Sequence, residues 1–271
     1  MAELENKVVI ITGASSGIGY ACAEEFAKTK CRLVLAARNA TNLSNAVAEL
    51  SKKYNCEIVE VAADVSNEHD CKKIISEALA HFGTIDVLIA NAGVSMRAVF
   101  NDTDLSVIKQ LMDINFWGTV YCTKFALPEI LKNHGSIVGV SSIAGYVGLP
   151  GRTGYSASKF AMQGFLGALR SENQKNNLHV MICCPGYTQS NIRVTALNKE
   201  GKPQGDTPLN ESHLMTSEEV AIQIVRGIKT RRRTLVLTAQ GKLSVWLSKF
   251  FPTLLDKLAF KKISKEADSP F

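Results

Sequence analysis

The sequence predicts an α/β fold of the doubly wound, Rossmann type, in which about seven parallel strands carry helices on both faces and a helical tail follows. Two observations predict it. Short apolar runs rich in β-branched residues alternate with longer segments whose apolar residues recur every three or four positions. The short runs are apolar throughout, as expected for strands covered by helices on both sides. Repeated strand–helix–strand units of this kind build one parallel sheet.

The expected strands occur at seven places along the chain. They are residues 7–13, 31–38, 57–65, 85–93, 135–142, 180–186 and 234–238. The segments of helical period lie between these strands. They are residues 18–30, 41–54, 67–82, 103–133, 155–175 and 217–229.

Two segments interrupt this alternation. Residues 191–216 are polar, rich in turn formers and too long for a routine connection, which favours a substrate loop or lid. Residues 241–263 place leucines and aromatic residues at helical intervals beside lysines, and Pro252 should divide them into two short helices. We therefore expect a single cofactor-binding and catalytic domain over residues 1–240 and an amphipathic basic tail over residues 241–271.

The charge is concentrated at one end of the chain. The net charge is +6, but residues 226–271 hold 11 basic and 3 acidic side chains, so the first 225 residues carry −2. A near-neutral body does not favour nucleic acid as a partner. The start of the chain lacks the features of a signal peptide, and no apolar run reaches the ~18 residues of a membrane span. These features predict a cytoplasmic protein.

The cysteines and histidines show no metal-binding pattern. No two of the seven cysteines have CxxC spacing, and the five histidines lack zinc-like spacing. The sequence therefore predicts reduced thiols and no metal site.

A glycine-rich turn follows the first expected strand. It reads Thr12-Gly13-Ala14-Ser15-Ser16-Gly17-Ile18-Gly19, and a helical pattern begins at once. Glycines let the backbone turn tightly and approach a pyrophosphate, which then meets the free N–H groups at the start of the helix. The turn predicts a dinucleotide site.

The end of the second strand indicates which dinucleotide is bound. Enzymes that prefer NAD place an acidic residue there to hold the ribose 2′-hydroxyl. Here the strand ends in Ala37-Arg38, with a guanidinium beside the place of the acid. Arg38 suits a 2′-phosphate, so NADP(H) is the expected cofactor.

Ser142, Tyr155 and Lys159 form the expected catalytic group. Ser142 ends the fifth strand, while Tyr155 and Lys159 lie four residues apart on the following helix and therefore share a face. A nearby ammonium favours the phenolate, so Lys159 is expected to lower the pKa of Tyr155. Tyr155 would then be the general acid for a carbonyl oxygen, or the general base in reverse, and Ser142 would donate a hydrogen bond to that oxygen.

Taken together, these motifs resemble the short-chain dehydrogenase/reductase family over roughly residues 6–190. The matching motifs occur in family order. They are TGASSGIG at 12–19, Asp64-Val65, Asn91-Ala92-Gly93, Asn115, Ser142, Tyr155-x-x-x-Lys159 and Pro185-Gly186.

The resemblance implies a role for each matching residue in cofactor binding. The pyrophosphate and adenosine ribose would be surrounded by Gly13, Ser15, Ser16, Gly17, Ile18 and Gly19. The adenine end would be met by Arg38, Asp64 and Val65, and the crevice would be lined by Asn91, Ala92 and Gly93. The nicotinamide end would be completed by Tyr155, Lys159, Pro185, Gly186, Thr188 and Ser190.

The resemblance also implies further details of the catalytic end. Lys159 would hold the nicotinamide ribose hydroxyls, and Asn115 would position a water that relays protons through Lys159. Ser190 keeps a hydroxyl for the carboxamide, whereas Thr188 replaces the aliphatic residue frequent at that place in the family.

The tail and the 191–216 segment resemble those of membrane-associated members of the family. These include 11-beta-hydroxysteroid dehydrogenases, 3-ketodihydrosphingosine reductase and acyl-dihydroxyacetone-phosphate reductase, and they imply a lipid- or steroid-like carbonyl substrate. Three hypotheses remain open for the tail: contact with a membrane surface through residues 241–263, a flap over the substrate pocket, or packing against a second subunit. The lysines of the tail favour the membrane slightly, which would make the protein peripheral.

The sequence thus predicts an NADP(H)-dependent oxidoreductase that interconverts a carbonyl and an alcohol. Similar enzymes imply a homodimer or homotetramer built through residues 103–133 and 155–175. Two alternatives remain. A soluble 3-ketoacyl thioester reductase is disfavoured by the tail and by Ser16, where such enzymes commonly carry a basic residue, and a non-catalytic NADPH sensor or scaffold is disfavoured by the intact Ser142, Tyr155 and Lys159.

Overall fold

The computed structural model describes residues 4–205, 214–266, 269 and 271, so part of the 191–216 loop, residues 206–213, lies outside the described residues. Seven strands form one sheet in the order β3-β2-β1-β4-β5-β6-β7, and every neighbouring pair is parallel. The strands are β1 (Val8–Thr12), β2 (Arg32–Ala37), β3 (Ile58–Ala62), β4 (Val87–Ala90), β5 (Ser136–Val140), β6 (His179–Cys184) and β7 (Thr234–Val236). The predicted fold class is confirmed.

The helices follow the order that the apolar periodicity predicts. They are α1 (Gly17–Lys28), α2 (Ala40–Lys53), α3 (Glu68–Phe82), α4 (Leu105–Leu111), α5 (Gly118–Lys132), α6 (Thr153–Glu172), α7 (Ser217–Lys229), α8 (Ala239–Phe250) and α9 (Pro252–Ile263). Short 3-10 turns occupy Phe100–Asp102, Ile143–Gly145 and Gln174–Asn176. The expected long helix at 103–133 contains a π-helical turn, η2 (Met112–Trp117), between α4 and α5.

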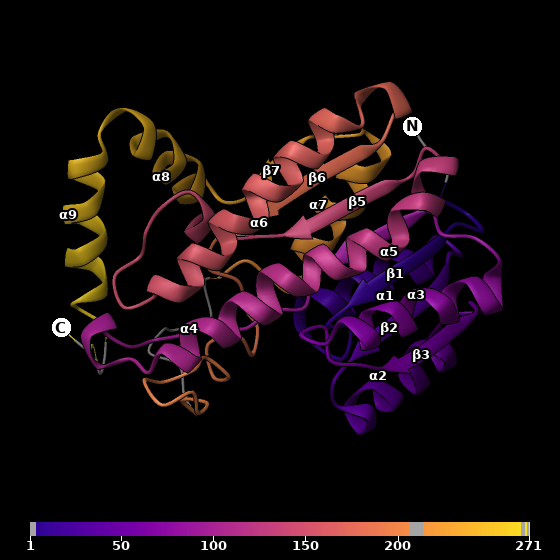
Figure 1. The fold of residues 1–271 in the computed structure, drawn as a ribbon, viewed down its shortest axis with the longest axis horizontal. Helices are drawn as coiled ribbons and strands as arrows, with labels where there is room; N and C mark the ends of the chain where they lie inside the picture. Colours follow the sequence, from indigo (N-terminus) through magenta and orange to yellow (C-terminus); the bar gives the residue numbers. More distant parts are fainter. Residues whose placement is uncertain (1–3, 206–213, 267–268, 270) are drawn as a thin grey trace.

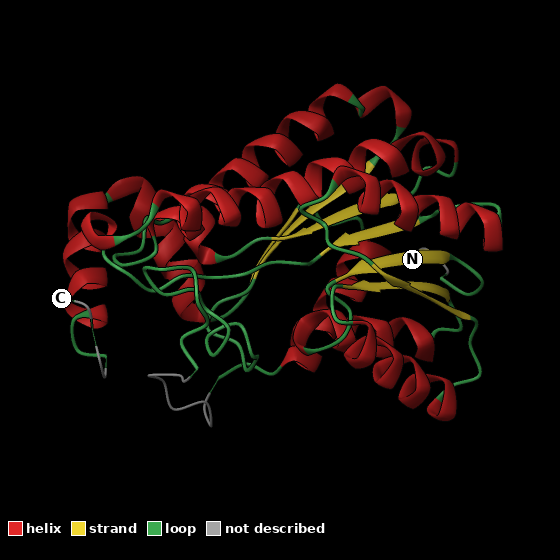
Figure 2. Cartoon of the chain, turned by 60° about the horizontal axis from the view of Figure 1, so that its bottom comes forward, coloured by secondary structure: helices red, strands yellow, loops and turns green. Residues whose placement is uncertain are grey.

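Two apolar clusters hold the helices to the sheet, one on each face (Figure 2). Along β1, Ile10 belongs to the cluster that includes α3, α5 and α6, whereas Val9 and Ile11 belong to the cluster that includes α1, α2 and α7. Successive side chains of a strand point to opposite faces, so a strand between two helix layers must be apolar at every position.

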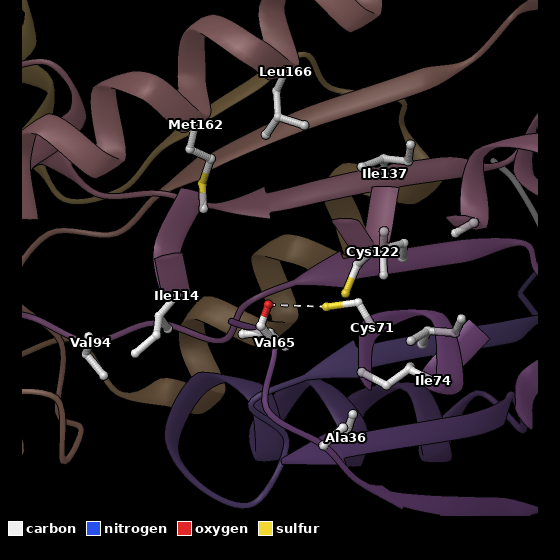
Figure 3. Packing of buried hydrophobic residues seen from close by; sticks show 14 of the residues in the cluster. Ala36, Val65, Cys71, Ile74, Val94, Ile114, Cys122, Ile137, Met162 and Leu166 are labelled. Atoms are coloured by element: carbon white, nitrogen blue, oxygen red, sulfur yellow. Dashed lines mark hydrogen bonds between the residues drawn. The ribbon is translucent and has the colours of Figure 1, made fainter. Parts of the chain in front are cut away.

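Figure 3 shows part of the first of these clusters. Met162 and Leu166 of α6 lie over the sheet near Ile137 of β5. The thiol of Cys71 donates a hydrogen bond of 3.2 Å to the carbonyl oxygen of Val65, at the carboxyl end of β3. The seven cysteines are all free thiols in the structure. This packing fixes α6 and the loop after β3, which carry predicted site residues.

The tail forms the two short helices that the sequence predicts, α8 and α9, which meet at Phe251 directly before Pro252. Figure 1 shows them at the end of the molecule toward which the carboxyl ends of β5 and β6 point. Among the described helices, none combines the length and hydropathy needed to cross a membrane.

Candidate active site

The glycine-rich turn after β1 is folded against the end of β4. Gly13 and Gly17 have φ angles of +65° and +55°, in the left-handed region that favours glycine. A Cβ atom at Gly19 would lie 2.2 Å from the carbonyl oxygen of Gly13, and one at Gly13 would lie 2.9 Å from Cα of Ala92. The spacing of the three glycines therefore reflects backbone conformation and close approach rather than a flexible loop.

The start of α1 provides donors for an anion. The Ser16 side chain makes no cap hydrogen bond, which leaves the N–H groups of the first turn open at the positive end of the helix. Ser15 is half-buried beside them, Ser16 is exposed, and Ile18 lines the cavity described below. These features fit a pyrophosphate, as the sequence predicts.

Asn91 holds the turn in place. Its side-chain Nδ2 donates hydrogen bonds to the carbonyl oxygens of Thr12 (2.9 Å) and Gly13 (3.2 Å). The backbone N–H groups of Asn91 and Ala92 donate to Oγ1 of Thr12 at 3.0 and 3.1 Å. The Asn91-Ala92-Gly93 segment thus joins the end of β4 to the glycine turn, and both Asn91 and Gly93 line the cavity.

The residues predicted for the adenine end follow β2 and β3, which are neighbouring strands. Arg38 is exposed directly after β2. Asp64 accepts hydrogen bonds from the N–H and hydroxyl of Ser66, at 2.9 and 2.8 Å, while the helix that follows is capped by Asn67. The Val65 side chain packs in the core, where a Cβ atom at Gly118 would lie 2.8 Å from its Cγ2.

The predicted catalytic side chains converge where β5 ends and α6 begins. Ser142 accepts a hydrogen bond of 3.2 Å from the N–H of Ala144 and makes a side-chain hydrogen bond with Tyr155. Nζ of Lys159 donates a hydrogen bond of 2.9 Å to the carbonyl oxygen of Val140 and lies 5.9 Å from the centroid of the Tyr155 ring. Ser142, Tyr155 and Lys159 line one cavity.

Burial, rather than the neighbouring ammonium, dominates the acidity of Tyr155. Desolvation raises the pKa of Tyr155, while the hydrogen bond from Ser142 and the charge of Arg152 act in the opposite direction. Desolvation also lowers the pKa of Lys159 to about 8. The expectation that Lys159 lowers the pKa of Tyr155 is therefore wrong in this structure, because both groups are deeply buried. A protonated phenol is the form that can donate to a carbonyl oxygen.

Asn115 lies in the π-helical turn η2 and is completely buried. Its Oδ1 accepts a hydrogen bond of 2.8 Å from the N–H of Val94, and its Nδ2 donates to the carbonyl oxygen of Val94 and to Oγ of Ser158, at 3.0 and 2.9 Å. The amide thus holds the loop after β4 to α6. A Cβ atom at Gly93 would lie 3.0 Å from Oδ1 of Asn115 and 3.4 Å from Nζ of Lys159, so Gly93 separates these two side chains.

The segment after β6 closes the site from the opposite side. Thr188, which is buried, donates a hydrogen bond of 3.2 Å from Oγ1 to the carbonyl oxygen of Gly186. A Cβ atom at Gly17 would lie 3.5 Å from Cβ of Ser190, so Ser190 lies over the glycine turn. The cavity lining from this segment includes Pro185, Gly186, Thr188 and Ser190.

The cavity has a volume of about 700 Å³ and lies between the catalytic residues and the tail. The apolar side chains of the tail that line it are Leu243, Leu247, Leu255, Leu258, Ala259 and Ile263. The first turn of α8 packs on the 3-10 turn that follows Ser142, because a Cβ atom at Gly241 would lie 2.8 Å from Cδ1 of Ile143. The tail therefore covers the predicted active site. This position is the one expected from the hypothesis that the tail is a flap over the substrate pocket.

Comparison with known proteins decides the family. The model of the short chain dehydrogenase family matches residues 7–201. The chain is a member of the short-chain dehydrogenase/reductase family. The resemblance seen in the sequence is thus confirmed.

Two relatives differ in how much of the chain they match. The chain is 36% identical over 272 residues to dehydrogenase/reductase SDR family member 7B of Xenopus tropicalis, covering 98% of this chain and 88% of that protein. It is 43% identical over 188 residues to 11-beta-hydroxysteroid dehydrogenase-like 2 of Arabidopsis thaliana, covering 69% of this chain and 60% of that protein. The first match spans both the catalytic domain and the tail.

Solved structures agree with the fold. A short-chain dehydrogenase/reductase from Burkholderia phymatum in complex with NAD superimposes with a TM-score of 0.83 at 25% identity, covering 94% of this chain and 96% of that one. An alcohol dehydrogenase from Thermococcus sibiricus complexed with 5-hydroxy-NADP gives a TM-score of 0.72 at 24% identity, covering 85% and 95% of the two chains.

The residues of this short-chain dehydrogenase/reductase cavity that were not predicted as site residues from the sequence include Arg152, Tyr187, Arg193 and Lys262. Arg152 is the N-cap residue of α6, three residues before Tyr155, and this short separation along the chain was a usable signal. Lys262 lies 4.4 Å above the centroid of the Tyr187 ring, a contact between α9 and the loop after β6. No local sequence pattern predicts this contact between Lys262 and Tyr187.

An ion-pair cluster joins the end of the tail to the body of the enzyme. The Glu266 carboxylate lies 3.6 Å from Nη2 of Arg97 and 3.8 Å from Nη2 of Arg152. The Glu266 side chain is only 4% exposed, and both arginines are buried. Breaking such a pair on one side leaves a buried charge, so the cluster fixes the position of the tail over the cavity.

Proposed function

We propose that this protein is an NADP(H)-dependent oxidoreductase that interconverts a carbonyl and an alcohol on a lipid- or steroid-like substrate. The observation that carries the proposal is the convergence of Ser142, Tyr155 and Lys159 on one cavity, whose other wall is apolar and comes from the tail. The carbonyl oxygen of a ketone bound in this cavity would lie beside the hydroxyl donors of Ser142 and Tyr155. The apolar part of the ketone would contact the leucine side chains of the tail.

In the reductive direction, a bound nicotinamide dinucleotide supplies the hydride. The Tyr155 hydroxyl transfers its proton to the carbonyl oxygen as negative charge develops there, so that one hydride and one proton convert the ketone to an alcohol. The Ser142 hydroxyl donates a hydrogen bond to the same oxygen and orients it. Lys159, held by Val140, lies beside the phenol, where it would bind the hydroxyls of the nicotinamide ribose and so orient the cofactor toward Tyr155.

NADP(H) is proposed over NAD(H) on the basis of Arg38. The residue at the end of β2 is Ala37, and the exposed guanidinium of Arg38 follows it at the edge of the predicted adenosine site. A guanidinium can bind a 2′-phosphate through two parallel hydrogen bonds, whereas an acidic residue would repel it.

The test is turnover with a panel of carbonyl compounds in the presence of NADPH or NADH. We expect NADPH oxidation with apolar ketones, and a fall of about 10²-fold or more in kcat for Tyr155→Phe, because this variant keeps the ring and lacks the acidic proton. Tyr121→Phe is the matched control, since Tyr121 stacks on Trp117 and is not among the residues that line the cavity. Full activity of Tyr155→Phe would disprove the mechanism.

The two alternative functions give different results in the same assay. A 3-ketoacyl thioester reductase would turn over thioesters and leave free apolar ketones unchanged. A sensor or scaffold would bind NADPH and oxidise none of it with any carbonyl. The tail wall favours our proposal over the thioester reductase, because its leucine side chains add an apolar surface suited to the chain of a lipid- or steroid-like ketone.

We further propose peripheral contact between the tail and a membrane surface. The corner between α8 and α9 exposes Trp246, Phe250, Phe251 and Leu254, each about half exposed or more. Exposed lysines flank this corner at 242, 249, 257 and 261. Aromatic residues beside lysines suit the boundary between lipid headgroups and acyl chains. The tail would then cover the active site with one face and touch lipid with another.

A homo-oligomer is proposed in which η2 and α6 form the subunit contacts. Trp117 of η2 and Phe160 of α6 are 42% and 46% exposed, and they lie on the segments for which the sequence predicts subunit contacts. Covering these rings would remove apolar area from water. Light scattering during size-exclusion chromatography tests this proposal, which a monomeric mass at micromolar concentration would exclude.

A further inference from the structure

The charged side chains of the cavity have one sign. Among its described lining residues, Arg152, Lys159, Arg193 and Lys262 are basic and none is acidic. Lys159 belongs to the proposed mechanism and Arg193 donates a hydrogen bond of 2.8 Å to the carbonyl oxygen of Thr188. Arg152, the N-cap of α6, and Lys262 of α9 have no such assigned task in the cavity.

Among the described residues, the carboxylate that pairs with Arg152 is that of Glu266, which is not part of the cavity lining. Glu266 is 3.8 Å from Nη2 of Arg152, beyond hydrogen-bond distance, and its side chain is 4% exposed. Neither carboxylate oxygen of Glu266, nor Nε of Arg152, has a hydrogen-bond partner among the described residues. Buried charges are normally hydrogen-bonded as well as paired, so this contact leaves binding capacity on Arg152.

The charges of this region do not balance. Among the described residues of this part of the cavity, Arg152 and Lys262 contribute two positive charges, and the one carboxylate paired with Arg152, that of Glu266, contributes one negative charge. Lys262 also lies over the Tyr187 ring at 4.4 Å, which directs its ammonium toward the same side of the cavity. Because Arg152 is buried, an added oxyanion would neutralise part of this excess in a site of low solvation and supply an acceptor.

We infer that Arg152 and Lys262 form an oxyanion subsite of the substrate cavity, and that Glu266 of the tail competes with the bound oxyanion for Arg152. The inference rests on the proposed function and narrows it to ketones that carry a carboxylate or a phosphate beside an apolar chain. The subsite is separate from the predicted cofactor phosphates, because those lie at the start of α1 and at Arg38. Since Arg152 is the N-cap of the helix that carries Tyr155 and both residues line the cavity, the oxyanion would bind at the catalytic end of the cavity.

Two variants that break the ion pair between Arg152 and Glu266 distinguish this subsite from a contact that only holds the tail in place. Arg152→Gln removes the proposed anion donor, and Glu266→Gln removes only its competitor. If the pair merely holds the tail in place, both variants should change KM in the same direction. If Arg152 binds the substrate oxyanion, the two variants should change KM for an anionic ketone in opposite directions.

The assay uses NADPH with 4-oxododecanoate, with its neutral methyl ester, and with 2-oxododecyl phosphate. For Arg152→Gln, we expect the ratio of kcat/KM for the anionic ketone to that for the ester to fall about tenfold or more, and for Lys262→Gln to fall less. Glu266→Gln should raise this ratio. Lys257→Gln, which removes an exposed charge of α9 outside the cavity lining, is the control for loss of charge on the tail. Comparison of kcat/KM for 4-oxododecanoate and 2-oxododecyl phosphate shows whether the subsite prefers a carboxylate or a phosphate.

The possible failures can be told apart. Equal kcat/KM for the acid and its ester, or parallel changes in Arg152→Gln and Glu266→Gln, would overturn the subsite while leaving the reductase function intact. If no ketone is reduced, the proposed function fails, and calorimetric titration with laurate and dodecanol then tests the subsite directly. Binding of laurate that Arg152→Gln weakens and Glu266→Gln strengthens supports the subsite, and equal affinity for laurate and dodecanol rejects it. Should Arg152→Gln fail to fold, Lys262→Gln and Glu266→Gln provide the same comparison.

Discussion

The ammonium of Lys159 donates a hydrogen bond of 2.9 Å to the carbonyl oxygen of Val140, the last residue of β5. This bond ties the first turns of α6 to the carboxyl end of the sheet, and the same helix face carries Tyr155. Lys159 is almost completely buried, at 2% exposure. The position of the proposed proton donor is therefore set by a contact between a helix side chain and a strand carbonyl.

The buried ammonium should make stability depend on pH. Burial lowers the pKa of Lys159 from 10.5 to about 8. Between these two values, the unfolded chain holds a proton that the folded protein has released, so the free energy of unfolding rises with pH through this group. Below about pH 8 both states are protonated and the contribution is constant.

Lys159→Met isolates this contribution. Because the variant lacks the titrating group, the free energy of unfolding of the wild type should rise relative to the variant between about pH 8 and 10. Urea unfolding at several pH values in this range measures the difference. A difference that stays constant, or that favours the variant as pH rises, would contradict the deep burial of a charged Lys159.

Gly19 should tolerate no side chain. In Gly19→Ala, the new Cβ would lie 2.2 Å from the carbonyl oxygen of Gly13 and 2.6 Å from Nδ2 of Asn91, so the turn must shift. We expect a loss of about 1–3 kcal/mol in the free energy of unfolding and a loss of about tenfold or more in NADPH affinity. Thermal unfolding and fluorescence titration with NADPH measure these effects.

Gly164→Ala is the matched control. Gly164 is exposed on α6 and a Cβ atom there would meet nothing within 4 Å. Alanine in a helix should stabilise the protein by ~0.5–1 kcal/mol and leave NADPH affinity unchanged. Unaltered NADPH binding in Gly19→Ala would show that the turn does not hold the cofactor.

Arg38 should set the choice between the two dinucleotides. Arg38→Asp removes the proposed donor to the 2′-phosphate and introduces an acceptor suited to a 2′-hydroxyl. We expect the ratio of kcat/KM for NADPH to that for NADH to fall by about tenfold to hundredfold, chiefly through KM for the cofactor. Arg32→Asp, at the first residue of β2 and therefore at the opposite end of this strand from Arg38, controls for the change in net charge. An unchanged ratio in Arg38→Asp would show that Arg38 does not distinguish the 2′-phosphate of NADPH from the 2′-hydroxyl of NADH.

The α8–α9 corner should bind lipid vesicles. We expect the wild type to float with vesicles of phosphatidylcholine and phosphatidylserine, and the double variant Phe250→Ser and Phe251→Ser to float several-fold less, because it loses exposed apolar area. Ile222→Ser removes a comparably exposed apolar side chain from α7 and should have no effect. Flotation of the double variant to the same extent as Ile222→Ser argues against membrane contact at this corner.

The sequence by itself determined the alternation of strands and helices, the glycine turn, and the spacing of Tyr155 and Lys159. These features are local: side chains repeat with the period of the element they occupy, and residues four apart on a helix share a face. The break at Pro252 was predictable for the same reason, since proline removes a helical hydrogen bond within its own segment.

Only the tertiary structure decided how distant segments meet. The tail covers the catalytic wall because Glu266 meets Arg97 and Arg152 and because leucines of α8 and α9 line the cavity. The periodicity of these leucines predicts the tail helices, but it does not predict which surface they pack on. The acidity of Tyr155 also depends on what surrounds it. Spacing alone suggests an ammonium that lowers its pKa, whereas desolvation by the packed cavity raises it. The spacing of residues identifies the catalytic pair, and the packing around that pair determines its protonation.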